Sequence, residues 1–256
     1  MNAEKRQAGI VAAVAREGRV HVTELATRYG VTVETIRRDL GALDRAGALR
    51  KVHGGAVPAL VSASPETGVA ERELAAAPAK AAIAAAALEA LEPGEGMSIL
   101  LDAGTTTAAL ARLLPAGLDL RVITDSLLIA SLLAPRESIS VRVLGGQVRG
   151  MTQAAVGPEA LDALAHLRVD VTVLGANGIS AEHGLSTPDP DEAAVKRAMA
   201  RAGRRVLALV DASKIGQEHL VSFADTADVD LLITNAPLPE PLASQLSTTG
   251  TEVRIA

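Results

Sequence analysis

Residues 20–40 read VHVTELATRYGVTVETIRRDL, and this stretch decides the fold of the first part of the chain. A threonine precedes each of two apolar-periodic runs, so we expect Thr23 to cap a helix over 24–29 and Thr32 to cap a longer one over 33–46. Gly30 stands where the first helix would end in a left-handed conformation. Two short helices joined by a glycine turn predict a helix-turn-helix over about residues 20–39.

The flanking sequence supplies the rest of a small domain. Residues 4–16 carry apolar side chains at helical spacing and predict a preceding helix. Beyond the two helices, LRKVHGGAV at 49–57 predicts two short strands around a Gly-Gly turn. We therefore predict a winged helix-turn-helix domain over residues 1–57, with its wing at about 49–57.

The predicted helix over 33–46 presents two different faces. With about 100° per residue, Ile36, Leu40 and Leu43 share one side with Val33, and Arg38 lies almost opposite them. An exposed arginine beside short polar side chains suits the major groove, where a guanidinium can bond two acceptors on guanine. The predicted DNA contacts, from this helix and the wing, are Thr32, Glu34, Thr35, Arg37, Arg38, Arg45, Arg50, Lys51, His53, Gly54 and Gly55.

The run Arg37-Arg38-Asp39 can also be interpreted as an ordinary solvated helix face. The capped helices, the basic wing and the local charge favour DNA binding instead. Residues 1–57 carry ten Lys or Arg against six Asp or Glu, whereas the remaining residues carry fifteen against twenty-four. The N-terminal part can therefore approach a polyanion, and the acidic remainder cannot.

The pattern changes after the predicted wing. A stretch rich in Ala, Ser and Pro over 58–70 predicts a linker, and helices then alternate with short apolar strands over 71–256. Such strands, separated by crossover helices, predict a mostly parallel, doubly wound α/β sheet covered on both faces. The predicted strands are 97–101, 120–124, 140–144, 169–175, 205–210, 231–234 and 252–255, and the predicted helices are 107–114, 127–133, 159–167, 191–202 and 239–246.

Polar and glycine residues follow these strands, at the carboxyl ends where an open parallel sheet binds its ligands. The loop with Asp102, Gly104, Thr105, Thr106 and Thr107 is the sharpest case, because glycine, hydroxyls and a helix start suit a phosphate. Two plainer interpretations stay open: a threonine of this loop only caps the helix, and a lysine at a strand end is an ordinary surface residue. The other candidates at strand ends are Asp125, Ser126, Gly145, Gly146, Asn177, Gly178, Asp211 and Lys214.

The chain resembles a known family in both parts. Residues 20–26, 31–40 and 52–56 closely resemble the DNA-binding domain of DeoR-type regulators, with Thr32 where the family usually has serine. The region from Glu71 onward resembles their effector domain through motifs such as DAGTT at 102–106 and DASK at 211–214. Asp125 stands where the family commonly has asparagine.

This resemblance implies a repressor of carbohydrate genes that binds double-stranded operator DNA as a dimer or tetramer and responds to a phosphorylated sugar. It adds Thr124, Arg149 and Lys196 to the predicted effector contacts. The effector domain of that family is similar in fold to ribose-5-phosphate isomerase, so an active isomerase is the alternative.

An isomerase needs a positioned carboxylate base. In our register, the isomerase pattern has an acid at Asn177 and its glutamate base near Lys196, and neither residue here can do that work at neutral pH. A shifted register would bring Glu192 to the position of the base. We expect a sensor with no catalytic residue.

Composition excludes several other functions. The chain has no cysteine, its five histidines lack metal-ligand spacing, and it contains no GxxxxGK[ST] or GxGxxG, so we expect neither metal nor cofactor. The most apolar stretch, 81–88, is far shorter than the roughly 20 residues of a membrane span, and residues 1–7 do not resemble a secretory signal. We expect a soluble, cytoplasmic protein.

Overall fold

The computed structural model describes residues 3–17, 20–45, 48–52, 54–57 and 67–256. The chain divides into two compact units, an N-terminal unit over residues 1–64 and a C-terminal unit over 65–256. Most of the predicted linker and His53 lie outside the described residues.

The N-terminal unit is a helix-turn-helix with a small sheet. Its helices are α1 (Ala3–Glu17), α2 (Val22–Tyr29) and α3 (Val33–Arg45), and its strands β1 (Val20–His21), β2 (Arg50–Val52) and β3 (Gly55–Val57) form an antiparallel sheet in the order β1-β3-β2. Ile10, Leu25, Ile36 and Leu40 are fully buried in its core, and the ring of Tyr29 packs against that core.

One predicted cap is confirmed in this unit and one is wrong. The Thr32 hydroxyl oxygen accepts a hydrogen bond from the backbone N–H of Thr35 (3.2 Å), as an N-cap of α3 should. Helix α2 begins two residues before the predicted start, at Val22, so Thr23 lies inside it and caps nothing. Gly30 ends α2 with φ of 63°, which is the predicted left-handed conformation.

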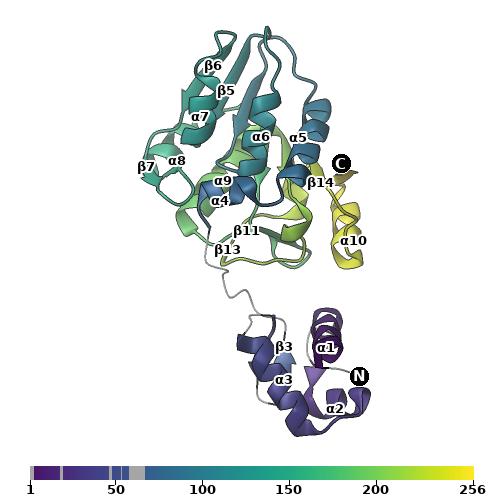
Figure 1. The fold of residues 1–256 in the computed structure, drawn as a ribbon. Helices are drawn as coiled ribbons and strands as arrows, with labels where there is room; N and C mark the ends of the chain where they lie inside the picture. Colours follow the sequence, from purple (N-terminus) through teal and green to yellow (C-terminus); the bar gives the residue numbers. More distant parts are fainter. Residues whose placement is uncertain (1–2, 18–19, 46–47, 53, 58–66) are drawn as a thin grey trace. The chain divides into compact units, whose positions relative to one another are not determined.

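The C-terminal unit is built on a seven-stranded parallel sheet (Figure 1). Its strands are β4 (Ser98–Leu101), β5 (Leu120–Thr124), β6 (Ile139–Val143), β9 (Val169–Gly175), β12 (Gly203–Leu209), β14 (Leu231–Thr234) and β15 (Glu252–Ile255). Their order is β15-β14-β12-β9-β4-β5-β6, so the winding direction reverses between β4 and β9. All seven strands were predicted, with bounds that differ by at most two residues, and a doubly wound sheet binds ligands at such a reversal.

Helices cover both faces of this sheet. On one face α5 (Ala77–Leu91), α6 (Thr105–Leu113) and α7 (Leu127–Leu133) pack over side chains such as Ile99 and Leu101. On the other face α8 (Pro158–Ala165), α9 (Pro190–Ala202) and α10 (Glu240–Thr249) pack over side chains such as Leu100 and Leu174. Because β4 contributes alternate residues to both cores, it is buried on both sides, as its nearly continuous apolar sequence predicted.

The prediction lacked the first helices of this unit and its short antiparallel strands. The missing elements are α4 (Val69–Leu74), α5, the hairpin β7 (Gln147–Arg149) with β8 (Ala154–Val156), and the sheet of β10 (Gly178–Ser180), β11 (Gly184–Thr187) and β13 (Val221–Ala224). Two 3₁₀ turns, η1 (Ala212–Lys214) and η2 (Thr226–Asp228), complete the unit. No helix in the described ranges is long and apolar enough to cross a bilayer.

Candidate functional site

The face of α3 predicted to read DNA is open to solvent. Ile36 and Leu40 are fully buried on the inner side, Val33 and Leu43 pack partly against the same core, and Arg38 is exposed. Thr32, Glu34 and Arg37 are exposed too, and Thr35 is half-buried. Among the described residues of the N-terminal unit, therefore, none covers the proposed reading side chain Arg38.

Asp39 does not belong to this solvent-facing set. Its carboxylate is buried, where it accepts from Nε of Arg6 (2.6 Å) and Nε2 of Gln7 (3.0 Å). Burial opposes the charge on Asp39, but these two donors outweigh it and hold the pKa of the carboxyl below its ordinary value. The Arg37-Arg38-Asp39 run is thus divided, with two arginines facing out and one aspartate fixing α3 to α1.

The wing depends on a close backbone approach. A Cβ at Gly55 would lie 1.9 Å from the carbonyl oxygen of Val20, so only glycine fits between β3 and β1. Gly54 has φ of 80° in the turn, and Lys51 is exposed on β2. Residues 45 and 50 lie in described elements, but their side chains fall outside the described part of the structure.

In the C-terminal unit, a cavity of about 120 Å³ lies at the carboxyl ends of β4, β5, β9 and β12. We call it the strand-end pocket. It sits at the reversal of strand order and brings together half of the sixteen residues predicted to contact an effector. These are Gly104, Thr105, Thr106, Asp125, Asn177, Lys196, Asp211 and Lys214.

A buried ion pair joins the two sides of the reversal. Nζ of Lys196 donates to the carboxylate of Asp102 and to the carbonyl oxygen of Gly175 (3.0 Å). The Asp102 carboxylate also accepts from the backbone N–H of Gly175 (2.7 Å) and the hydroxyl of Thr107 (2.9 Å). Burial works against the charge of Lys196, yet the nearby carboxylates, Asp102 first, raise the pKa of its ammonium.

Asp125 is a buried acid of the strand-end pocket with an unsatisfied oxygen. It is 3% exposed, and its Oδ1 has no hydrogen-bond partner among the described residues. Burial, followed by the negative charge of Asp102, raises the pKa of this carboxyl to about 8, although Lys196 opposes the shift. Asp125 is therefore mostly protonated at pH 7.

The lining also contains four cationic side chains. Arg72, Lys80, Lys196 and Lys214 face the cavity, so three of the five lysines in the chain converge there. Lys196 is paired with buried Asp102, and the lining carboxylate of Glu192 is paired with Arg149, so Arg72, Lys80 and Lys214 meet Asp211 as the remaining lining carboxylate when Asp125 is neutral. The local balance is therefore positive inside a unit whose overall charge is negative.

Strand-end reasoning missed Arg72 and Lys80 because both precede the first strand. Arg72 lies on α4 and Lys80 on α5. Lys80 did leave a signal in the sequence, since it is the one charged residue among the apolar residues of 77–88. A charge on an otherwise apolar helix must find a polar environment within the fold.

The other eight predicted effector residues do not line the cavity. Asp102, Thr107, Thr124 and Ser126 are buried, and their polar atoms serve the framework: Ser126, for example, caps α7 by accepting from the backbone N–H of Ile129. Gly145 and Gly146 are exposed on the turn before β7, and Gly178 is buried in β10. The strand-end rule leads to the edge of the sheet where the cavity lies, but it does not distinguish lining residues from those that support them.

Arg149, the last of these eight, holds a lining carboxylate in place. Its guanidinium bonds Oε1 of Glu192 (2.6 Å) and lies 3.1 Å from Oδ2 of Asp189. The Thr152 hydroxyl also contacts Glu192. The shifted register therefore does place a carboxylate at the cavity, but this carboxylate is tied into an ion pair rather than free to take a proton from a ligand.

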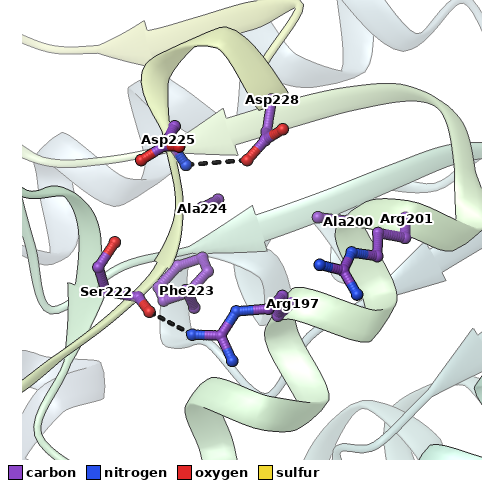
Figure 2. Close-up of a pocket in the computed structure, with 8 residues that line it drawn as sticks. All are labelled: Arg197, Ala200, Arg201, Ser222, Phe223, Ala224, Asp225 and Asp228. Atoms are coloured by element: carbon purple, nitrogen blue, oxygen red, sulfur yellow. Dashed lines mark hydrogen bonds between the residues drawn. The ribbon is translucent and has the colours of Figure 1, made fainter.

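A larger cavity of about 360 Å³ lies elsewhere in the C-terminal unit, between α9 and β13 (Figure 2). Arg197 and Arg201 line it opposite Asp225 and Asp228, so its charges balance. Nη2 of Arg197 donates to the carbonyl oxygen of Ser222 (2.5 Å), and no described lining side chain has a buried polar atom without a partner. The strand-end pocket is thus the better candidate for a ligand. In the described ranges, no group of three or more His, Asp or Glu residues is placed to hold a metal.

Comparison with known proteins identifies both units. Residues 6–59 match the DeoR-like helix-turn-helix domain, and residues 75–236 match the DeoR C terminal sensor domain. A putative aga operon transcriptional repressor of Escherichia coli O157:H7 is 31% identical over 97% of this chain and 92% of the relative. The glycerol-3-phosphate regulon repressor of Escherichia coli K12 is 33% identical over 93% of each chain.

Among solved structures, ribose 5 phosphate isomerase A from Neisseria gonorrhoeae matches 56% of this chain and 53% of its own, at 18% identity and a TM-score of 0.37. This likeness is too weak to bear on function. The two domain matches and the near full-length relatives agree on a regulator rather than an enzyme. The chain belongs to the DeoR family of DNA-binding transcriptional regulators.

Proposed function

We propose that this regulator is a repressor whose affinity for operator DNA is controlled by a small phosphorylated metabolite that binds in the strand-end pocket. The observation that carries the proposal is the convergence of four cationic side chains on one cavity at the reversal of strand order. The relatives named as repressors of a glycerol-3-phosphate regulon and an aga operon support both the sign of regulation and the ligand class.

The pocket offers complementary groups to such a ligand. A phosphate suits the start of α6 at Thr105 and Thr106, where the first turn of a helix carries N–H groups without helical partners. Lys80 and Lys214 supply positive charge beside it. A hydroxyl group on the carbon skeleton suits the unpartnered Oδ1 of Asp125, and the cavity of about 120 Å³ favours a small skeleton.

On the DNA side, Arg38 reads a base edge in the major groove while Arg37 and Lys51 contact phosphates. We infer a homodimer or tetramer, because a helix-turn-helix protein gains affinity and specificity from two half-sites. The effector changes DNA affinity only to the extent that it binds one arrangement of the oligomer better than the other, commonly by about 1–3 kcal/mol.

The experiment has two stages. A thermal-shift panel of inorganic phosphate, glycerol 3-phosphate and five- and six-carbon sugar phosphates identifies ligands, and binding to a duplex selected by the protein from a random library is then measured with each hit. We expect Arg38→Ala to weaken duplex binding about 10- to 100-fold, in line with the loss of a bidentate base contact. The matched control is Arg142→Ala, which removes an exposed arginine of the C-terminal unit. The proposal fails if no phosphorylated compound binds, or if ligands leave duplex affinity unchanged.

A further inference from the structure

Arg72 on α4 has an unusual environment. Its side chain lines the strand-end pocket, and its Nε and Nη2 atoms are buried without a hydrogen-bond partner among the described residues. Burying guanidinium N–H groups with nothing to accept them is costly, so such donors normally meet an acceptor. The same residue lines the cavity, and a planar pair of guanidinium N–H groups fits a phosphate oxygen pair well.

Lys80 connects α4 to the same cavity. Its Nζ donates to the carbonyl oxygens of Arg72 and Ala75 (2.8 Å), at the C-terminal end of α4. Burial lowers the pKa of Lys80, and the charges of Lys214 and Arg72 add to this effect, while Asp211 and Glu73 oppose it. An anion between these three cations would relieve both their mutual repulsion and the unsatisfied donors of Arg72.

We propose that Arg72 binds the phosphate of the effector, and that α4 transmits the effect of ligand binding in the pocket to the DNA-binding unit. This inference rests on the proposed function and adds a residue and a route to it. Helix α4 begins at Val69, directly after the segment that joins the two units in sequence. Among the helices and strands that line the strand-end pocket, α4 is therefore the one nearest in sequence to the wing.

Contacts away from the pocket fix the position of α4. The carboxylate of Glu73 bonds Nη2 of Arg112 on α6 (2.6 Å), and the backbone N–H of Val69 donates to the carbonyl oxygen of Met151 (3.2 Å). Glu73 does not line the cavity. It therefore offers a way to loosen α4 without removing a ligand contact.

The first test is binding of inorganic phosphate and glycerol 3-phosphate by isothermal titration calorimetry, using the full-length protein. We expect Arg72→Gln to weaken binding at least about tenfold, as the loss of a charge-assisted contact does, while the matched control Arg142→Gln leaves it unchanged. Wild-type affinity in Arg72→Gln would overturn the inference. If the wild-type protein itself binds neither probe nor any sugar phosphate, the proposed function fails instead.

The second test measures duplex affinity with and without saturating glycerol 3-phosphate, or the tightest hit of the panel. We expect Glu73→Ala to retain ligand affinity within about threefold but to lose at least half of the ligand-induced change in duplex affinity. A circular dichroism spectrum confirms that this variant is folded. A Glu73→Ala response equal to that of wild type would overturn the route through α4, even if Arg72 proves to bind phosphate.

Discussion

Replacing Asp125 by asparagine changes one buried group in the strand-end pocket from titratable to permanently neutral. Burial and the neighbouring charge of Asp102 raise the pKa of this carboxyl from an ordinary 3.8 to about 8 in the folded chain. Between these two values the folded protein holds a proton that the unfolded chain has released. The stabilising contribution of protonated Asp125 is therefore complete below about pH 4 and is lost as the pH rises toward 8.

The size of the effect follows from the linkage relation. One proton of difference changes the free energy of unfolding by about 1.4 kcal/mol per pH unit, or about 3 kcal/mol from pH 5 to pH 7. The asparagine side chain introduced at this position has no such dependence, because an amide does not titrate in this range. We expect Asp125→Asn to gain stability relative to wild type by that amount over the same two pH units.

Urea unfolding followed by far-ultraviolet circular dichroism at pH 5, 6 and 7 measures this difference. The N-terminal unit is identical in both proteins, so its own pH dependence cancels when the two profiles are subtracted. If the difference in unfolding free energy between the two proteins stayed constant from pH 5 to pH 7, Asp125 would be ionised in the folded state. That result would refute the reasoning.

Three further changes test the framework of the two sites. Thr32→Ala removes the N-cap of α3 and should cost about 1 kcal/mol of unfolding free energy, measured by thermal unfolding against Thr23→Ala, whose hydroxyl caps no helix. Lys196→Met leaves Asp102 buried without its cation and should cost about 3–5 kcal/mol; a loss below about 1 kcal/mol in urea unfolding would show that the pair is not needed for stability. Gly55→Ala forces a Cβ onto the carbonyl oxygen of Val20 and should disrupt the wing, lowering duplex affinity, whereas Gly94→Ala in the C-terminal unit meets no atom within 4 Å and should not.

The central sheet could be predicted because its strands are buried on both sides. A strand such as β12 must be apolar at nearly every buried position, and this leaves a continuous apolar run such as 206–209 that differs from an amphipathic helix. Helix α3 was equally predictable, because Ile36 and Leu40 are buried and Arg38 is exposed at helical period.

The elements that escaped prediction have weaker local patterns. Helix α5 is mostly alanine and apolar on several sides, so it shows no stripe with a helical period, and only its packing against two strands and α6 reveals its orientation. The strands β7, β8 and β10 have three residues each, too few to display an alternation. Their pairing is set by tertiary contacts.

The strand pattern predicted the edge of the sheet at which the pocket lies, but not which residues line the pocket. Sequence order shows that Asp102, Thr107 and Asp125 follow strands, but not that Asp102 turns inward to Lys196 while Asp125 faces the cavity. Arg72 and Lys80 reach the site from helices that precede the sheet. Only the folded arrangement places them opposite residues that lie more than a hundred positions later in the chain.

Tyr29 packs against the core of the N-terminal unit, and it is the chain's single tyrosine, with no tryptophan anywhere in the sequence. Tyrosine emission of the unaltered protein therefore originates in the DNA-binding unit alone. Circular dichroism weights the larger sensor unit, so the two signals recorded on one sample separate the melting of the two units without any label. A ligand that acts only within the sensor should shift the dichroism transition and leave the tyrosine emission curve in place, whereas coupling between the units should move both.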